Sequence, residues 1–200
     1  VLANRRQWEQ VVADGIAKRD ELEKRTKKLK GEYIRPIALL QAQPKSKVKA
    51  TITVEQLKQM LLDSKIPEEQ IKIKTSDADE LEGIDLFSKK CEVRYILTVN
   101  ALAEGWDCSF AYVLISVANL GARVAVEQII GRVLRMPNAR RKDDEAMNRS
   151  YVFASSEDFN EAADKVIKGL TDNGYSKSDF VNVADEQGYS DPLQAKKAIK

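Results

Sequence analysis

The sequence predicts an α/β fold, a three-layer sandwich in which a mainly parallel sheet lies between helices. Short apolar runs alternate along the chain with helical segments, which is the pattern of strand–helix–strand units with right-handed crossovers. Several runs are apolar at successive positions rather than at every second one, as in parallel strands that are covered on both faces. The strands are predicted at 37–41, 71–74, 95–99, 112–117 and 151–154.

The first predicted helix spans residues 3 to 30. Val12 and Leu22 are among the apolar residues that recur at helical spacing, and Gly31 is suited to end the helix. The second half of this helix is almost entirely polar. We interpret it as the solvated face of a helix that joins another domain, rather than as an arm that binds nucleic acid.

Capping residues and periodicity predict the remaining helices. Thr53 is suited to cap a helix over 53–65, because its hydroxyl can accept a hydrogen bond from a free amide of the first turn. Further helical segments are expected at 85–90, 126–137 and 157–170. The predicted organisation is a charged helix or connector at 1–31, an α/β lobe at 32–172, and a polar tail or docking segment at 173–200.

Composition excludes several classes of protein. The chain has no histidine and its two cysteines, Cys91 and Cys108, are far apart, which argues against a zinc site and against histidine-dependent catalysis. Unclustered cysteines are typical of the reducing cytoplasm. No apolar run reaches the length of a membrane span, so no membrane partner is expected. The net charge of +2 means that any nucleic-acid site must be local.

The predicted helix at 126–137 has two contrasting faces. Gln128, Arg132 and Arg135 lie together on one face, and Gly131 bares the backbone beside them. Two arginines without a carboxylate in their own stripe are suited to bind an anion, because each guanidinium offers a fixed fork of donors to phosphate oxygens. The alternative is that they are solvated or paired with nearby acids. The apolar face holds Val126, Ile129, Ile130, Val133 and Leu134.

Polar residues follow the third predicted strand, at the edge where open parallel sheets bind ligands. Asn100, Glu104, Gly105 and Asp107 come directly after this strand, and Gly105 allows the backbone to bend or to approach a ligand closely. The segment after the fourth strand leads into the arginine helix at 126–137. The two segments are therefore expected to begin at the same edge of the sheet.

These residues resemble a known family. Gln128, Gly131, Arg132 and Arg135 match the QxxGRxxR pattern of motif VI in superfamily 2 helicases and translocases, and ALAEGWD at 101–107 resembles motif V. The run IALLQ, which ends in Gln41, is similar to the weaker motif IV. The segments EGWD and QIIGRVLRMP look most like those of the Res subunit of type III restriction enzymes. The resemblance covers about residues 34 to 155.

The resemblance implies a second RecA-like lobe, of the P-loop NTPase type, from an ATP-dependent DNA translocase or helicase. It implies that Arg132 and Arg135 contact the γ-phosphate of ATP, with Gln128 beside them. Asp107, Gly105 and Gly131 would lie on the nucleotide side of the site, with Gly105 also near the path that couples motif V to nucleic acid. Gln41 and Asn100 would face the nucleic-acid strand, and a DNA-modification (methyltransferase) subunit is implied as a further partner.

One departure from the family pattern decides how the motor would work. The sequence contains no GxxxxGK(S/T) phosphate loop and no DExx magnesium motif. The family places both in a first RecA-like lobe, which we expect to precede Val1 in a larger polypeptide and to hold ATP and Mg²⁺. The chain alone is not expected to hydrolyse ATP. The restriction nuclease, which the family carries farther toward its C-terminus, is not expected in this sequence; Asp85 with Glu92 is the nearest candidate acid pair.

A local basic segment fits a nucleic-acid partner. Lys45 and Lys47 lie in PKSKVK at 44–49, directly after the first predicted strand, where they could contact DNA phosphates. An ordinary solvated loop is an equal alternative. At the level of function, the alternatives are an RNA or DNA-repair helicase of superfamily 2, and a non-catalytic α/β docking module.

Overall fold

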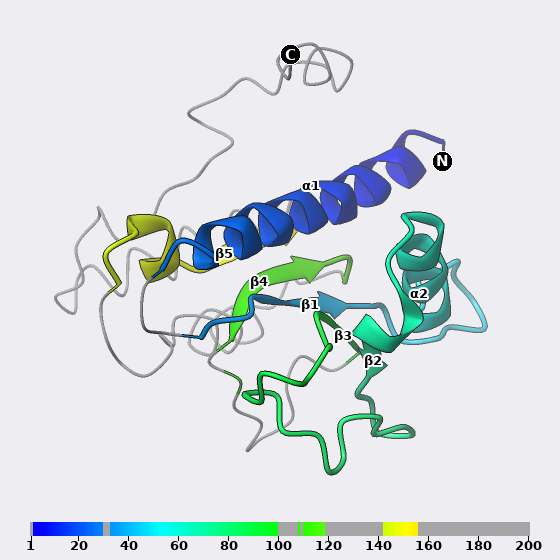
Figure 1. The fold of residues 1–200 in the computed structure, drawn as a ribbon. Helices are drawn as coiled ribbons and strands as arrows, with labels where there is room; N and C mark the ends of the chain where they lie inside the picture. Colours follow the sequence, from blue (N-terminus) through cyan, green and yellow to red (C-terminus); the bar gives the residue numbers. More distant parts are fainter. Residues whose placement is uncertain (1, 30–32, 100–107, 109, 119–141, 156–200) are drawn as a thin grey trace, which may run out of the picture.

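A five-stranded, all-parallel sheet forms the centre of the protein (Figure 1). The computed structural model describes residues 2–29, 33–99, 108, 110–118 and 142–155. The strands stand in the order β2-β3-β1-β4-β5, which confirms the predicted α/β class and parallel sheet. Their bounds are β1 Ile37–Gln41, β2 Ile71–Ile73, β3 Tyr95–Thr98, β4 Ala111–Ser116 and β5 Tyr151–Ala154.

Four strands end in register. Gln41 at the end of β1 pairs with Thr98 of β3 and with Ser116 of β4, and Ser116 pairs in turn with Ala154 of β5. Because the strands are parallel, these four residues form one line across the sheet. The chain segments that leave β1, β3, β4 and β5 therefore all begin at one edge, which we call the carboxyl edge.

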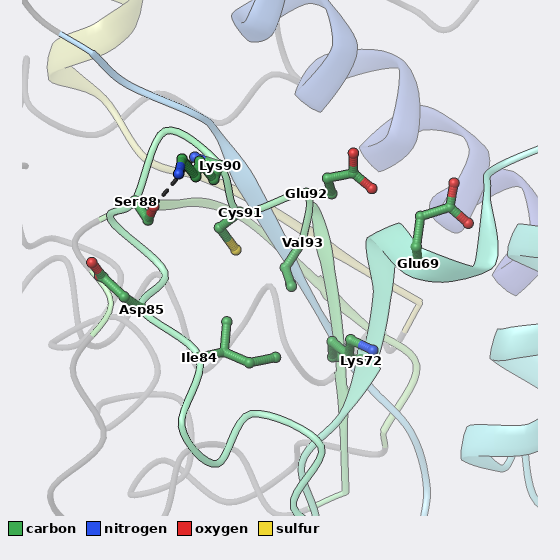
Figure 2. A pocket seen from close by; sticks show the side chains of 9 residues that line it. All are labelled: Glu69, Lys72, Ile84, Asp85, Ser88, Lys90, Cys91, Glu92 and Val93. Carbon is green, nitrogen blue, oxygen red and sulfur yellow. Dashed lines mark hydrogen bonds between the residues drawn. The ribbon is translucent and has the colours of Figure 1, made fainter.

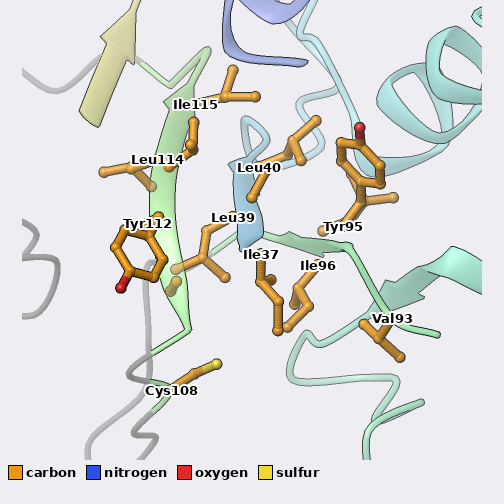
Figure 3. Packing of buried hydrophobic residues seen from close by; sticks show 14 of the residues in the cluster. Ile37, Leu39, Leu40, Val93, Tyr95, Ile96, Cys108, Tyr112, Leu114 and Ile115 are labelled. Atoms are coloured by element: carbon orange, nitrogen blue, oxygen red, sulfur yellow. The ribbon is translucent and has the colours of Figure 1, made fainter. Parts of the chain in front are cut away.

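The central strands are buried on both faces. Every residue of β1, β3 and β4 is buried, whereas β5, at the border of the sheet, is only half-buried. Successive side chains of a strand point to opposite faces, and Figure 3 shows Leu39 and Leu40 leaving β1 in different directions among the buried residues around them. Burial on both faces explains why these strands appear in the sequence as continuous apolar runs.

Helix α1, Leu2–Thr26, lies along one face of the sheet and contacts β4, β5 and β1 (Figure 1). Val12 and Leu22 of this helix are fully buried. The predicted solvated second half is only partly solvated, because Arg19 and Thr26 are buried as well as Leu22. Arg19 forms ion pairs with Asp20 and Glu23 and donates from Nε to the carbonyl oxygen of Pro36 at 3.0 Å.

Helix α2, Val54–Asp63, connects β1 to β2 through the short helix η1, Glu68–Gln70, and contacts β3. Thr53 caps α2 as predicted. A second short helix, η3, Glu145–Asn148, precedes β5. None of the helices in the described ranges combines the length and the apolar character that crossing a membrane requires.

The predicted helical segment at 85–90 is wrong, because these residues form turns in the long link between β2 and β3. The cause is Arg35, whose buried guanidinium donates to the carbonyl oxygens of Leu86, Ser88, Cys91 and Val93. A helix would use such carbonyl oxygens internally. Here the carbonyl oxygens of Leu86 and Ser88 accept from the buried guanidinium, and that of Ser88 also accepts from the backbone amide of Cys91. The other two predicted helices, at 126–137 and 157–170, lie outside the described residues.

The contact between α1 and β4 at Gly15 has no room for a side chain. A Cβ atom at Gly15 would lie 2.4 Å from Cγ1 and Cδ1 of Ile115, which is fully buried. We expect Gly15→Val to lower the free energy of unfolding by about 2 kcal/mol, because helix and strand must separate to admit the new atoms. Urea unfolding measures this. Ala17→Val, at an exposed position of the same helix, controls for the valine itself, and equal effects of the two changes would contradict the close contact.

Candidate nucleic-acid interface at the carboxyl edge

Gln41 lies at the centre of the carboxyl edge, and its side-chain amide is held by internal partners. It is 5% exposed. Its Nε2 donates to the carbonyl oxygen of Val99 at 3.3 Å, and its Oε1 accepts from the hydroxyl of Ser116 at 3.0 Å. The amide thus joins the end of β1 to the ends of β3 and β4. The contact with a nucleic-acid strand that we predicted for Gln41 stays a prediction, and the described bonds of this side chain are all within the edge.

Gln43 makes a second set of bonds that the sequence did not reveal to us. Its Nε2 donates to the carbonyl oxygen of Val117 at 2.8 Å, and its Oε1 accepts from the amide of Ile52 at 3.0 Å. The backbone amide of Gln43 also donates to the carbonyl oxygen of Ile52 at 2.8 Å. Gln43 therefore closes the base of the loop that follows β1. The available signal was its spacing of two from Gln41, which puts both amides on the same side of the extended chain.

The segment 44–49 projects from this base and is called the lysine loop. Lys45, Lys47 and Lys49 are all exposed. The hydroxyl of Ser46 accepts from the backbone amides of Val48 and Lys49 at 3.2 and 3.1 Å, which fixes the turn at the tip. The loop therefore carries exposed positive charges on a backbone turn that internal hydrogen bonds hold in place. It lies at the carboxyl edge of the sheet.

The far end of the loop is anchored by the start of α2. Thr53 and Gln56 form a reciprocal capping box, in which the Thr53 amide donates to Gln56 Oε1 at 3.0 Å and the Gln56 amide donates to Thr53 Oγ1 at 3.5 Å. This satisfies amides that the first turn of a helix leaves free. The lysine loop is thus held between Gln43 and the cap of α2.

Glu55, in the first turn of α2, faces one of the lysines. Its carboxylate lies 2.7 Å from Nζ of Lys45, and both side chains are well exposed. The hydrogen bond from Lys45, followed by the bond involving Thr53, lowers the pKa of Glu55 from its ordinary 4.5 to about 2. The same bond raises the pKa of Lys45. Of the two lysines that we predicted to contact DNA, Lys45 is therefore partly neutralised by its own protein, and Lys47 forms no ion pair with any described residue.

The other predicted site residues lie outside the described residues. These are Asn100, Gly105, Asp107, Gln128, Gly131, Arg132 and Arg135. The structure does describe the residues from which their segments depart. Val99 follows β3 and is bonded to Gln41, whereas Val117 follows β4 and is bonded to Gln43. The two glutamines of the edge thus contact Val99 and Val117, the residues at which the chain leaves β3 and β4.

An open hollow lies at the opposite, amino-terminal edge of the sheet (Figure 2). Asp85 and Glu92 both line it, together with Lys72, Lys90 and Cys91. Among the described residues, no group of three or more acidic, cysteine or histidine side chains could hold a metal ion. Ligands of open parallel sheets bind at the carboxyl ends of the strands, so the hollow lies at the edge less suited to binding.

Comparison with known proteins gives no family for the chain. No protein-family model matches the sequence, and no curated protein matches it significantly.

The ion pair between Lys45 and Glu55 can be tested by titration. We expect Glu55 to titrate at about 2 and Lys45→Met to bring its pKa back towards 4.5, because the methionine removes the ammonium donor. The pKa is lower in the folded state, so the contribution of Glu55 to stability is complete above pH 4.5 and is lost as the pH falls towards 2. NMR of the side-chain carboxyl carbons measures the pKa. Lys58→Met is the control, since Lys58 pairs with Glu68; titration of the unmodified Glu55 near 4.5 would refute the pair.

Proposed function

We propose that the chain is the second motor lobe of an ATP-dependent DNA translocase or helicase, similar to the Res subunit of type III restriction enzymes. The observation that supports this best is the position of two motif-like segments relative to the sheet. EGWD lies between β3 and β4, and QIIGRVLRMP lies between β4 and β5. Because β3 and β4 flank β1 in a parallel sheet, the connections that contain these two segments leave the sheet at the edge where such sheets bind ligands.

In this proposal the arginines complete a nucleotide site that is mainly held elsewhere. A first RecA-like lobe in the same polypeptide would bind ATP and Mg²⁺, and the metal would neutralise charge on the phosphates. Arg132 and Arg135 would approach the γ-phosphoryl group from this lobe, with Gln128 and Gly131 beside them and Asp107 and Gly105 nearby. A guanidinium cannot lose its charge at neutral pH, so this stabilisation is present whenever the two lobes are closed.

The lysine loop would contact the DNA strand that the motor follows. Phosphate contacts of this kind supply affinity without reading sequence, which suits a protein that must move from one nucleotide to the next. The loop begins three residues after Gln41 and lies at the edge where β3 ends. A strand bound there would therefore lie close to the segment that resembles motif V.

The arginine assignment is tested by ATP hydrolysis in a polypeptide that joins this chain to its first lobe. Arg132→Ala or Arg135→Ala should lower the turnover of ATP by roughly a thousandfold or more, because the charge that spreads over the γ-phosphoryl oxygens loses its partner. DNA binding should change little. A steady-state assay of phosphate release gives turnover, and fluorescence anisotropy of a labelled oligonucleotide gives binding.

Arg149→Ala provides the matched control, since Arg149 is an exposed arginine next to β5. It should leave turnover unchanged. Normal turnover in both motif variants would sink the motor assignment and would favour the docking-module alternative. Hydrolysis that responds to RNA and not to DNA would keep the motor and change its substrate.

The DNA contact of the lysine loop is tested by its salt dependence. Lys47→Ala should make the slope of log affinity against log salt shallower by about 0.7 for single-stranded DNA, as expected when one phosphate contact is lost. Lys45→Ala should also weaken binding, because it removes a charge and leaves Glu55 unpaired beside the strand. Lys24→Ala, at an exposed position on α1, is the control, and three identical slopes would refute the contact.

A further inference from the structure

The peptide groups around Val117 are held by Gln41, the last residue of β1, and by Gln43, two residues beyond it. The amide of Val117 donates to the carbonyl oxygen of Gln41 at 3.0 Å, and the carbonyl oxygen of Val117 accepts from Nε2 of Gln43 at 2.8 Å. The first bond continues the sheet ladder by one residue beyond β4. The second comes from a side chain, so the position of Val117 depends on where the Gln43 amide lies.

The same Gln43 side-chain amide is also bonded to Ile52, beyond the far end of the lysine loop. Its Oε1 accepts from the Ile52 amide at 3.0 Å, and Ile52 is joined to the cap of α2 through Thr53. An amide group is rigid and planar, so a displacement of Ile52 that carries Oε1 with it also carries Nε2. Ile52 and Val117 are therefore linked through one rigid group, the side-chain amide of Gln43.

Gln41 extends this chain to the third strand. Its amide joins Val99 to Ser116, whose hydroxyl is fully buried. A buried hydroxyl or amide that loses its partner is costly, so the bonds around Gln41 tend to move as one group. Gln41 thus keeps the ends of β3 and β4 in fixed relation, and Gln43 ties that unit to the loop.

We infer that Gln41 and Gln43 form a relay that transmits binding of a nucleic-acid strand at the lysine loop to the points where the chain leaves β3 and β4. The inference rests on the proposed function, because it takes the strand to bind at the loop. It names Gln41 and Gln43 as positioning residues that act through Val99 and Val117. The connections that follow Val99 and Val117 contain the segments that resemble motifs V and VI. The relay would therefore make the positions of these connections depend on whether a strand is bound.

The relay is tested in the chain as it exists, with amide NMR and a single-stranded oligodeoxythymidine of about twenty nucleotides, which carries phosphates and stackable bases without secondary structure. In the unmodified protein, saturating DNA should shift the amide signals of Lys47, Ile52 and Val117. In Gln43→Met, which keeps the length of the side chain and removes both hydrogen bonds, the shift at Lys47 should persist and the shift at Val117 should be lost. Gln43 is only half-buried, so this change avoids the buried group around Gln41.

Gln43→Glu separates a relay from a merely structural role. A carboxylate still accepts from the Ile52 amide but has no donor for Val117, so the DNA-induced shift should persist at Ile52 and be lost at Val117. Gln59→Met, on the exposed side of α2 where Gln59 donates to Asp63, is the matched control and should change neither shift.

The two possible failures give different results. A shift at Val117 that survives in Gln43→Met and Gln43→Glu overturns the relay while leaving DNA binding at the loop intact. The absence of any DNA-induced shift at Lys47 and Ile52 in the unmodified protein overturns the nucleic-acid assignment of the loop, and the relay with it.

Discussion

The in-register parallel pairing of β1 with β3 and β4 is the constraint on which the rest of the structure depends. Pairing of Gln41 with both Thr98 and Ser116 fixes where three strands end. A shift of one residue would turn each strand's side chains to the opposite face, and strands buried on both faces have no solvated side to absorb such a change. The positions of the strand ends at the carboxyl edge are therefore fixed by the same packing as the core. Residues at these strand ends are held in fixed positions relative to one another.

Side-chain amides extend this order beyond the strands. Backbone groups at the end of a strand need partners as much as those within it, and Gln41 and Gln43 provide them for Val99, Val117 and Ile52. The alternative partner is water, which would leave each loop free to move independently. Amides that carry a donor and an acceptor on one rigid group connect the loops instead. The amides of Gln41 and Gln43 thereby connect the ends of β3 and β4 to the base of the lysine loop.

The sequence predicts those features that depend on neighbouring residues and misses those that depend on distant ones. All five strands were predicted to within one residue at each end, because burial on both faces produces continuous apolar runs. The cap at Thr53 was predicted because its partner is three residues away. The turns at 85–90 were missed because they depend on Arg35, about fifty residues earlier. The roles of Gln41 and Gln43 were missed similarly, since Ser116 and Val117 come from another strand.

The arginines near the amino edge of the sheet and the lysines of the loop at the carboxyl edge differ in their exposure. At the amino edge, the guanidinium groups of Arg19 and Arg35 are buried and bonded to carboxylates or carbonyl oxygens of the protein. Arg94 is paired with Glu23 there as well. At the carboxyl edge, the lysines of the loop stand in solvent, and the carboxylate of Glu55 pairs with only one of them. The guanidinium of Arg35 donates to carbonyl oxygens of the protein and so holds the fold together. The exposed lysines of the loop keep donors for phosphate, and they lie at the edge where open parallel sheets bind ligands.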